Sequence, residues 1–127
     1  MTTNYFAEGL KNLHRIDGEA GIAVIENLND IAPDLGNYIV EFAFGQIYAR
    51  PGLSLEEREL LTLASLLTAG DCETQLQVHI KAALHVGLEQ NKVIEAFLHC
   101  IPYTGFPKVL NAVTVARQVF AEATAAK

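Results

Sequence analysis

Three side chains that could support chemistry share one face of a predicted helix. Cys72 and His79 are seven residues apart, which is close to two turns of an α-helix, and Gln75 lies between them. A thiol, an amide and an imidazole on one face of a largely apolar helix form a candidate reactive centre. We expect the sulfur of Cys72 and the imidazole of His79 to open onto a common chamber that small molecules can enter.

The thiol of Cys72 has two interpretations. We expect Cys72 in the first turn of a helix, where the helix dipole and unsatisfied N–H groups favour a reactive thiolate. A free cysteine usually behaves, however, as a small buried hydrophobic residue. Position 75 holds glutamine, so there is no local dithiol. Cys100 is expected at the end of another helix, where the dipole disfavours a thiolate, and we interpret it as a packing residue.

His79 and Glu59 could form a proton-transfer pair. Histidine is the side chain best suited to proton transfer near neutral pH, although it could also bond only a backbone carbonyl in the core. Glu59 is the last charged residue before a long apolar stretch, so its carboxylate would be drawn towards the core and need a partner. His79 on the next helix is a suitable partner. The alternative for Glu59 is an exposed first-turn glutamate that complements the helix dipole.

Two further polar side chains could contact a substrate. Arg50 could bind a carboxylate, although an arginine at a helix C-terminus also complements the helix dipole. Tyr103 is in a segment bounded by prolines, next to Gly105, and could place its hydroxyl in a pocket. No two histidines are three or four residues apart, so no metal site is predicted.

The elements that must position these residues are helices. Helical periodicity extends along nearly the whole chain, which predicts an all-α helical bundle. The expected helices cover residues 6–16, 22–28, 33–50, 54–69, 72–86, 89–101 and 108–123, with residues 102–107 as a kinked connector. Ser54 and Glu57 form a capping box, and Gly70 and Gly87 end the two helices that follow it. These two helices are expected to form a central helical hairpin.

The composition sets limits on the function. The 127 residues fit a single domain over positions 1–127, and half of them are hydrophobic. A net charge of −6 with scattered basic residues argues against nucleic acid and anionic membrane surfaces as partners. No segment approaches the roughly 20 apolar residues of a membrane span, and the N-terminus lacks the pattern of a signal peptide. We therefore expect a cytoplasmic protein with reduced cysteines.

Four segments, in this order, resemble the carboxymuconolactone decarboxylase family. They are FGQIYARPGL at 44–53, ERELLTLASL at 57–66, HIKAAL at 79–84 and YTGFP at 103–107. The resemblance covers roughly residues 20–122. It implies an AhpD-like all-helical fold with a helical hairpin at its core, and a homo-oligomer, commonly a hexamer or trimer. The large hydrophobic fraction agrees with such an assembly, because obligate interfaces resemble a domain core cut in half.

The resemblance also implies a chemistry. The type enzyme of the family decarboxylates a γ-lactone without a metal or organic cofactor, and a histidine at the position of His79 resembles its proton-transfer residue. Loss of carbon dioxide leaves a carbanion-like dienolate, which an acid must reprotonate while donors hold the lactone oxygen. His79 would deliver the proton, and Arg50 or Tyr103 would hold the oxygen. Gln75 is a further candidate for contact with a small-molecule substrate.

A sister branch of alkylhydroperoxidases of the AhpD type provides an alternative. That branch combines a glutamate, two cysteines three residues apart and a histidine. Cys72 and His79 match its first cysteine and its histidine, but Gln75 replaces the second cysteine and Glu59 is about one residue out of register. A single-cysteine peroxidase or antioxidant would need an outside thiol to resolve the sulfenic acid formed by peroxide.

Three functions therefore remain open. The first is a cofactor-independent decarboxylase, of the lyase type, acting on a small carboxylated lactone or related metabolite with His79 as acid and base. The second is a peroxiredoxin-like thiol peroxidase, in which Cys72 attacks peroxide while Glu59 and His79 relay protons. The third is a non-catalytic helical assembly module.

Overall fold

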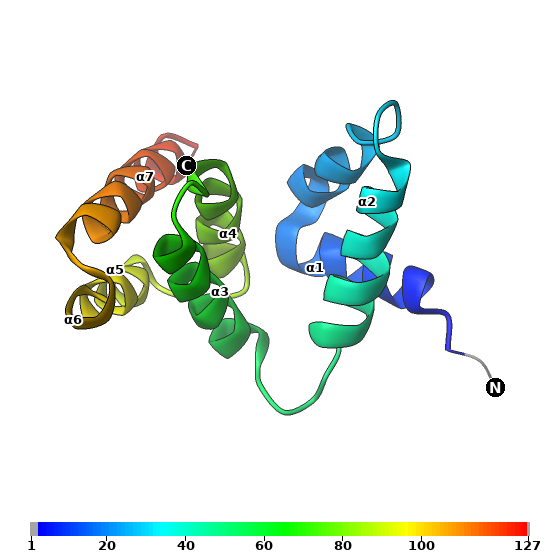
Figure 1. Ribbon diagram of the computed structural model, residues 1–127, viewed down its shortest axis with the longest axis horizontal. Coiled ribbons are helices and arrows are strands. Elements are labelled where there is room, and N and C mark those ends of the chain that lie inside the picture. The colour runs from blue at the N-terminus through cyan, green and yellow to red at the C-terminus, as the bar shows by residue number, and fades with distance from the viewer. Residues whose placement is uncertain (1–2, 127) are drawn as a thin grey trace. The chain divides into compact units, whose positions relative to one another are not determined.

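The regular elements of the protein are helices throughout residues 3–126, the part of the chain that the computed structural model describes. This confirms the predicted all-α fold class. The elements, in chain order, are α1 (Tyr5–Glu26), α2 (Pro33–Tyr38), the π-helix η1 (Ile39–Ile47), α3 (Leu55–Ala69), α4 (Glu73–His85), α5 (Gln90–His99), α6 (Ile101–Thr104) and α7 (Phe106–Ala125) (Figure 1). Among the described residues, none of these helices has both the length and the apolar character needed to cross a bilayer.

The chain divides into two compact units, with the boundary between Leu55 and Glu56. In Figure 1 the first unit runs from blue to blue-green and contains α1, α2 and η1, while the second runs from green to red and contains α3 to α7. The candidate residues Glu59, Cys72 and His79 all belong to the second unit.

α1 contains a break at Gly18, where φ is 62° and ψ is −149°. Glycine adopts this backbone conformation readily because it has no Cβ. The sequence prediction of two successive helices with a break near Gly18 is therefore confirmed. The first of them begins after Asn4, whose side-chain oxygen accepts a hydrogen bond of 3.0 Å from the Ala7 N–H.

The helix predicted over residues 33–50 differs from a regular α-helix in the structure. Only α2 is α-helical, and η1 continues it with wider π-helical turns. At its end the Tyr48 N–H donates to the Ala43 carbonyl, five residues earlier, at 2.8 Å. The prediction was wrong in this part because π-helical turns are rare, and nine residues are too few for the change of helical period to show in the hydrophobic pattern.

Two glycines bring α1 and η1 into backbone contact. A methyl group added at Gly9 would overlap the Val40 carbonyl oxygen and come within 2.7 Å of the Val40 carbonyl carbon. A methyl group added at Gly45 would likewise overlap the Tyr5 carbonyl oxygen. Only residues without a Cβ allow this close approach. The contact therefore depends on glycine at both positions.

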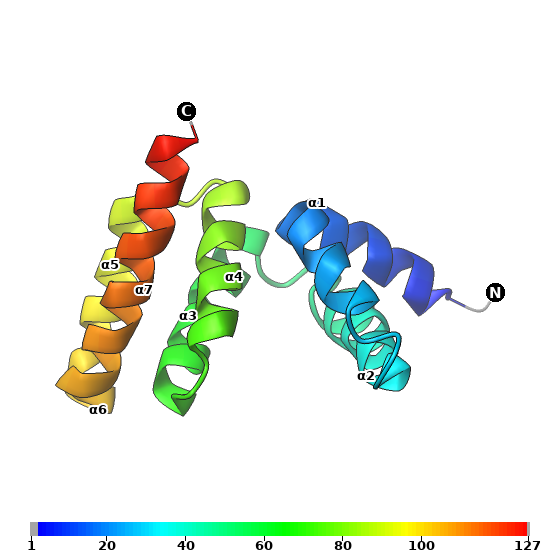
Figure 2. The same cartoon turned by 90° about the horizontal axis from the view of Figure 1, so that it is seen from above.

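The predicted helical hairpin is present as α3 and α4, which lie side by side in both views (Figures 1 and 2). Gly70 and Asp71 form the turn, and both have positive φ values, of 75° and 58°. Asparagine and aspartate tolerate this region better than other residues with a Cβ. The ammonium group of Lys108, on α7, donates a hydrogen bond of 2.7 Å to the Thr68 carbonyl and so caps the end of α3.

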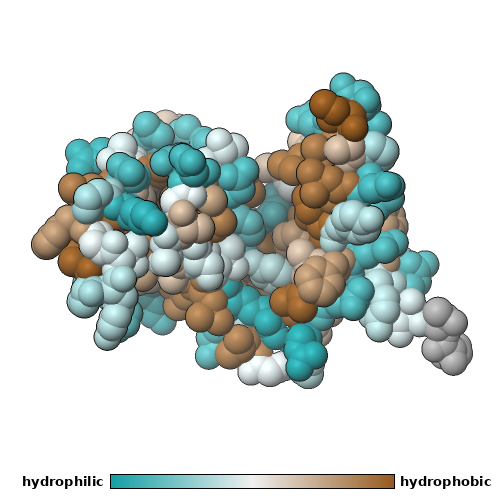
Figure 3. Space-filling view, viewed as in Figure 1, coloured by the Kyte–Doolittle hydropathy of each residue, from teal (hydrophilic) through white to brown (hydrophobic). Residues whose placement is uncertain are grey.

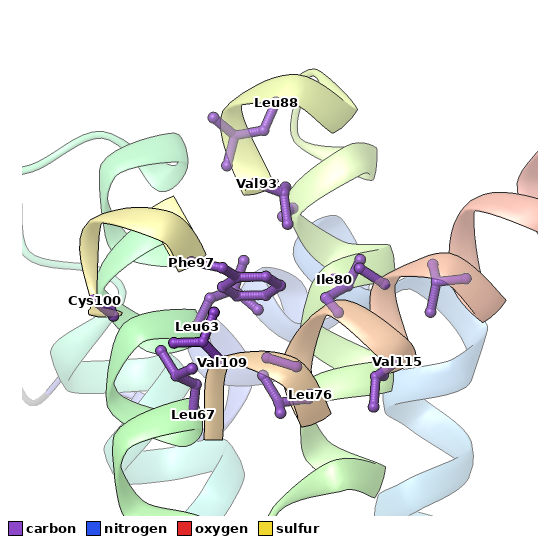
Figure 4. Close-up of a cluster of buried hydrophobic side chains, with 14 residues drawn as sticks. Leu63, Leu67, Leu76, Ile80, Leu88, Val93, Phe97, Cys100, Val109 and Val115 are labelled. Atoms are coloured by element: carbon purple, nitrogen blue, oxygen red, sulfur yellow. The ribbon is translucent and has the colours of Figure 1, made fainter. Parts of the chain in front are cut away.

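The second unit is held together by a continuous hydrophobic core. Phe97 lies at the centre of this cluster, with side chains of α3, α4 and α7 around it (Figure 4). Its fully or nearly fully buried members are Leu63, Leu67, Leu76, Ile80, Ala83, Leu88, Val93, Phe97, Cys100, Val109, Ala112, Val115, Ala116 and Val119. The core fixes α3 against α4 and thereby sets the distance between side chains that face each other across the hairpin.

The connector predicted over residues 102–107 is mostly helical. α6 forms one turn, and α7 begins at Phe106, two residues earlier than predicted. Only Gly105, with φ of 97°, separates the two helices. Pro102 and Pro107 each lie in a first helical turn, where the missing N–H is not needed. The prolines therefore mark helix starts here, and the glycine makes the break.

Candidate functional site: a buried glutamate and histidine

Glu59 and His79 form a hydrogen-bonded pair across the α3–α4 hairpin. Nδ1 of His79 lies 3.1 Å from Oε2 of Glu59. The Glu59 side chain has no exposed surface, and the His79 side chain is 18% exposed. Of the two alternatives for Glu59, the pairing with His79 is thus confirmed and the exposed first-turn glutamate is excluded.

The burial of Glu59 gives the pair its chemical character. A buried carboxylate is costly unless it has hydrogen-bonding partners, so Glu59 has a strong reason to keep its bond to the imidazole. A carboxylate at Nδ1 fixes the orientation of the ring and stabilises the imidazolium form. The imidazole is partly exposed, with its Nδ1 beside the buried carboxylate. This arrangement is typical of a general acid or base.

Cys72 lies at the N-cap of α4, one residue before the first turn in which we predicted it. Its thiol donates a hydrogen bond of 3.1 Å to the Gly70 carbonyl. Cys72 lines a cavity of about 20 Å³, which has room for about one water molecule. The lining residues are Leu66, Leu67, Gly70, Asp71, Cys72, Glu73, Leu76, Lys108 and Asn111. Neither Glu59 nor His79 lines this cavity, so it is not the common chamber that we expected.

The other predicted site residues lie elsewhere on the described chain. Gln75 is exposed on the first turn of α4. Tyr103 is 81% exposed on α6, with its ring centroid 5.8 Å from that of His99. Arg50 is exposed in the first unit, after η1. The substrate-binding roles of these three residues remain predictions.

Cys100 is buried in the core, as predicted, and burial raises the pKa of its thiol.

The sequence analysis did not identify Lys108, although this residue caps α3 and lines the cavity of Cys72. It is 36 residues from Cys72 and 40 from Thr68 in the sequence, and only the packing of α7 brings it there. No local pattern could have identified it.

The fold and the site together define an all-helical protein in which a buried glutamate is hydrogen-bonded to a histidine across a helical hairpin. The chain belongs to the carboxymuconolactone decarboxylase family, whose model matches residues 33–118. This match includes Glu59, Cys72 and His79, and it confirms the family resemblance found in the sequence.

Two named relatives support a decarboxylase-family role. The chain is 36% identical over 116 residues to 4-carboxymuconolactone decarboxylase of Acinetobacter baylyi. The aligned region covers 91% of this chain and 86% of the relative. It is 29% identical over 114 residues to the nitrosuccinic acid decarboxylase npaB of Metarhizium robertsii, covering 89% of this chain and 79% of that protein. A shorter region of 86 residues is 34% identical to peroxisomal protein 2 of Saccharomyces cerevisiae. It covers 67% of this chain and 30% of that protein.

Proposed function

We propose that this protein removes carbon dioxide from a small carboxylated lactone or a related metabolite, with His79 as the proton-transfer residue. The observation that carries the proposal is the 3.1 Å bond between His79 and the fully buried Glu59. Glu59 is a positioning residue in this scheme, because it acts through the imidazole. The family of decarboxylase relatives supports the reaction class.

The reaction has two steps in this proposal. The bond between the carboxyl carbon and the ring carbon breaks, carbon dioxide leaves, and the electron pair passes into the unsaturated system as a dienolate. The imidazolium of His79 then gives its Nε2 proton to carbon, and the ring regains a proton from solvent. The Glu59 carboxylate keeps the ring oriented and stabilises its charged form throughout. Arg50 or Tyr103 would hold the developing oxyanion, and Gln75 would contact the substrate.

The names of the two relatives suggest the substrates to test. Purified protein should be incubated with 4-carboxymuconolactone and, in parallel, with nitrosuccinic acid, and carbon dioxide release should be measured. We expect turnover of the lactone, because the relative with that substrate in its name has the higher identity, 36% against 29%. Release from nitrosuccinic acid alone would keep the reaction class and reject the lactone. No release from either compound would contradict this proposal for both substrates.

Replacing Cys72 by serine should leave decarboxylation within about twofold of the wild-type rate. The reason is that Cys72 lines a cavity to which neither Glu59 nor His79 contributes. The measurement is the rate of carbon dioxide release by Cys72→Ser and wild-type protein under the same conditions. A loss of more than about tenfold would place the thiol in the reaction. It would then contradict the proposed scheme, in which Cys72 takes no part in decarboxylation.

We also propose that the protein is cytoplasmic and works as a homo-oligomer, a hexamer or a trimer. The support is the family membership and the number of large apolar side chains at the surface, among them Ile31, Tyr38 and Phe106. Light scattering of the purified chain measures the assembly directly.

A further inference from the structure

A second cavity lies where the start of α1 meets η1 in the first unit. It has a volume of about 470 Å³ and is lined by Thr3, Asn4, Tyr5, Phe6 and Glu41. This volume is in the usual range for the sites of small ligands. The whole lining belongs to the first unit, whereas the buried glutamate and histidine belong to the second. The cavity is therefore separate from the candidate active site.

Local contacts hold the lining residues of this cavity in place. Gly45 allows the Tyr5 carbonyl to approach the backbone of η1, since a methyl group at Gly45 would overlap that oxygen. Glu41 lies four residues before Gly45, about one turn earlier on the same π-helix. The Asn4 side chain accepts a hydrogen bond of 3.0 Å from the Ala7 N–H, which fixes the start of α1. The cavity is thus built on two ordered helix starts.

The lining combines aromatic rings with one carboxylate. Tyr5 is 45% exposed and Phe6 is 38% exposed, so both side chains remain accessible. Glu41 is exposed as well, and within residues 3–126 no hydrogen bond or ion pair engages its carboxylate. Figure 3 shows apolar and polar side chains next to one another on the surface of this unit. The faces of aromatic rings carry negative partial charge, so rings and carboxylate both favour a cation.

We propose that this cavity binds a small organic cation with an alkylated ammonium group, taken up as a free solute. Glu41 balances the charge, while Tyr5 and Phe6 contact the alkyl groups through their rings. A bare Mg²⁺ or Ca²⁺ ion fits less well, because such ions require about six or more ligands, mainly oxygen, and aromatic carbons supply none.

Two further observations support a cation site here. Glu41 belongs to a π-helix, and π-helical turns are rare but frequent at functional sites. The net charge of −6 also attracts cations to the protein. The proposal is independent of the proposed decarboxylation, because it involves no residue of that scheme.

The first experiment measures the binding of choline chloride to the full-length chain by isothermal titration calorimetry, at constant ionic strength set with sodium chloride. The neutral carbon isostere of choline, in which a tert-butyl group replaces the trimethylammonium group, is titrated in parallel. Choline should bind saturably, and the isostere should bind more weakly by about fivefold or more, because it has the same shape without the charge.

The second experiment repeats the choline titration with charge variants. Glu41→Gln should weaken binding by about fivefold or more, since it removes the charge and keeps the size of the side chain. Glu8→Gln is the matched control. Glu8 is exposed in the first turn of α1 and does not line the cavity, so its replacement gives the same net charge and should keep the wild-type affinity.

A ring variant tests the aromatic part of the site. Tyr5→Leu keeps an apolar side chain but removes the ring, and it should weaken choline binding by about fivefold or more. If circular dichroism shows that Tyr5→Leu does not fold, Phe6→Leu takes its place.

Several results would overturn the proposal. They are the absence of saturable choline binding, equal affinity for choline and its neutral isostere, and wild-type affinity in Glu41→Gln or in the ring variant. Equal losses in Glu41→Gln and Glu8→Gln would count in the same way, because they would show that only the net charge matters. Binding to phosphatidylcholine vesicles without binding of free choline would assign the site to a lipid headgroup and reject a free solute.

Discussion

His79→Ala should lower the rate of decarboxylation by about 10²- to 10⁴-fold, which is the usual contribution of a positioned acid or base. The variant removes the imidazole that we propose to deliver the proton, and it leaves the carboxylate of Glu59 buried without this partner. The measurement is turnover at saturating substrate, together with a urea unfolding curve. The curve is needed because a buried acceptor that loses its bond costs about 1–3 kcal/mol of stability.

Glu59→Gln tests the other half of the same pair. Glutamine has nearly the same shape but no charge, so it stabilises the imidazolium less, and we expect a loss in kcat with KM nearly unchanged. The pH dependence of kcat should change as well, which a purely structural role of Glu59 would not produce. Glu56→Gln is the matched control, because Glu56 is exposed one turn earlier on α3. Full activity of both His79→Ala and Glu59→Gln would contradict the proposed role of the pair.

Gly9→Ala should destabilise the protein by about 3 kcal/mol or more, at the upper end of the costs of overpacking. The added methyl group would overlap the Val40 carbonyl oxygen and lie 3.0 Å from the Gly45 nitrogen. These are backbone atoms, so no side-chain rotation can relieve the overlap, and α1 must move away from η1. The measurement is the free energy of unfolding in urea, followed by circular dichroism.

Gly52→Ala is the control for this prediction. No atom lies within 4 Å of a methyl group added at Gly52, which is in the same unit. We expect its stability to stay within about 0.5 kcal/mol of wild type, as for most surface substitutions. If Gly9→Ala and Gly52→Ala unfolded at the same urea concentration, the close approach of α1 to η1 would not be a feature of the folded protein in solution.

Much of the second unit could be predicted from the sequence, because its signals are local. Gly70 and Gly87 end α3 and α4 where a left-handed residue was expected, with φ of 75° and 113°. The pairing of Glu59 with His79 was also predictable. Glu59 is the last charge before an apolar stretch and so needs a partner, and His79 is on the next helix of the hairpin. The break at Gly18 follows from the same kind of reasoning.

The tertiary structure alone decided the features that depend on residues far apart in the chain. The π-helical turns of η1 could not be predicted, because nine residues are too few for the change of helical period to show in the hydrophobic pattern. The backbone contact of η1 with Gly9 could not be predicted either, because it joins residues far apart in the chain. Lys108 caps α3 and reaches the cavity of Cys72 only because α7 packs beside the hairpin. Periodicity and capping report the preferences of a few neighbouring residues, whereas these contacts arise from how whole helices pack.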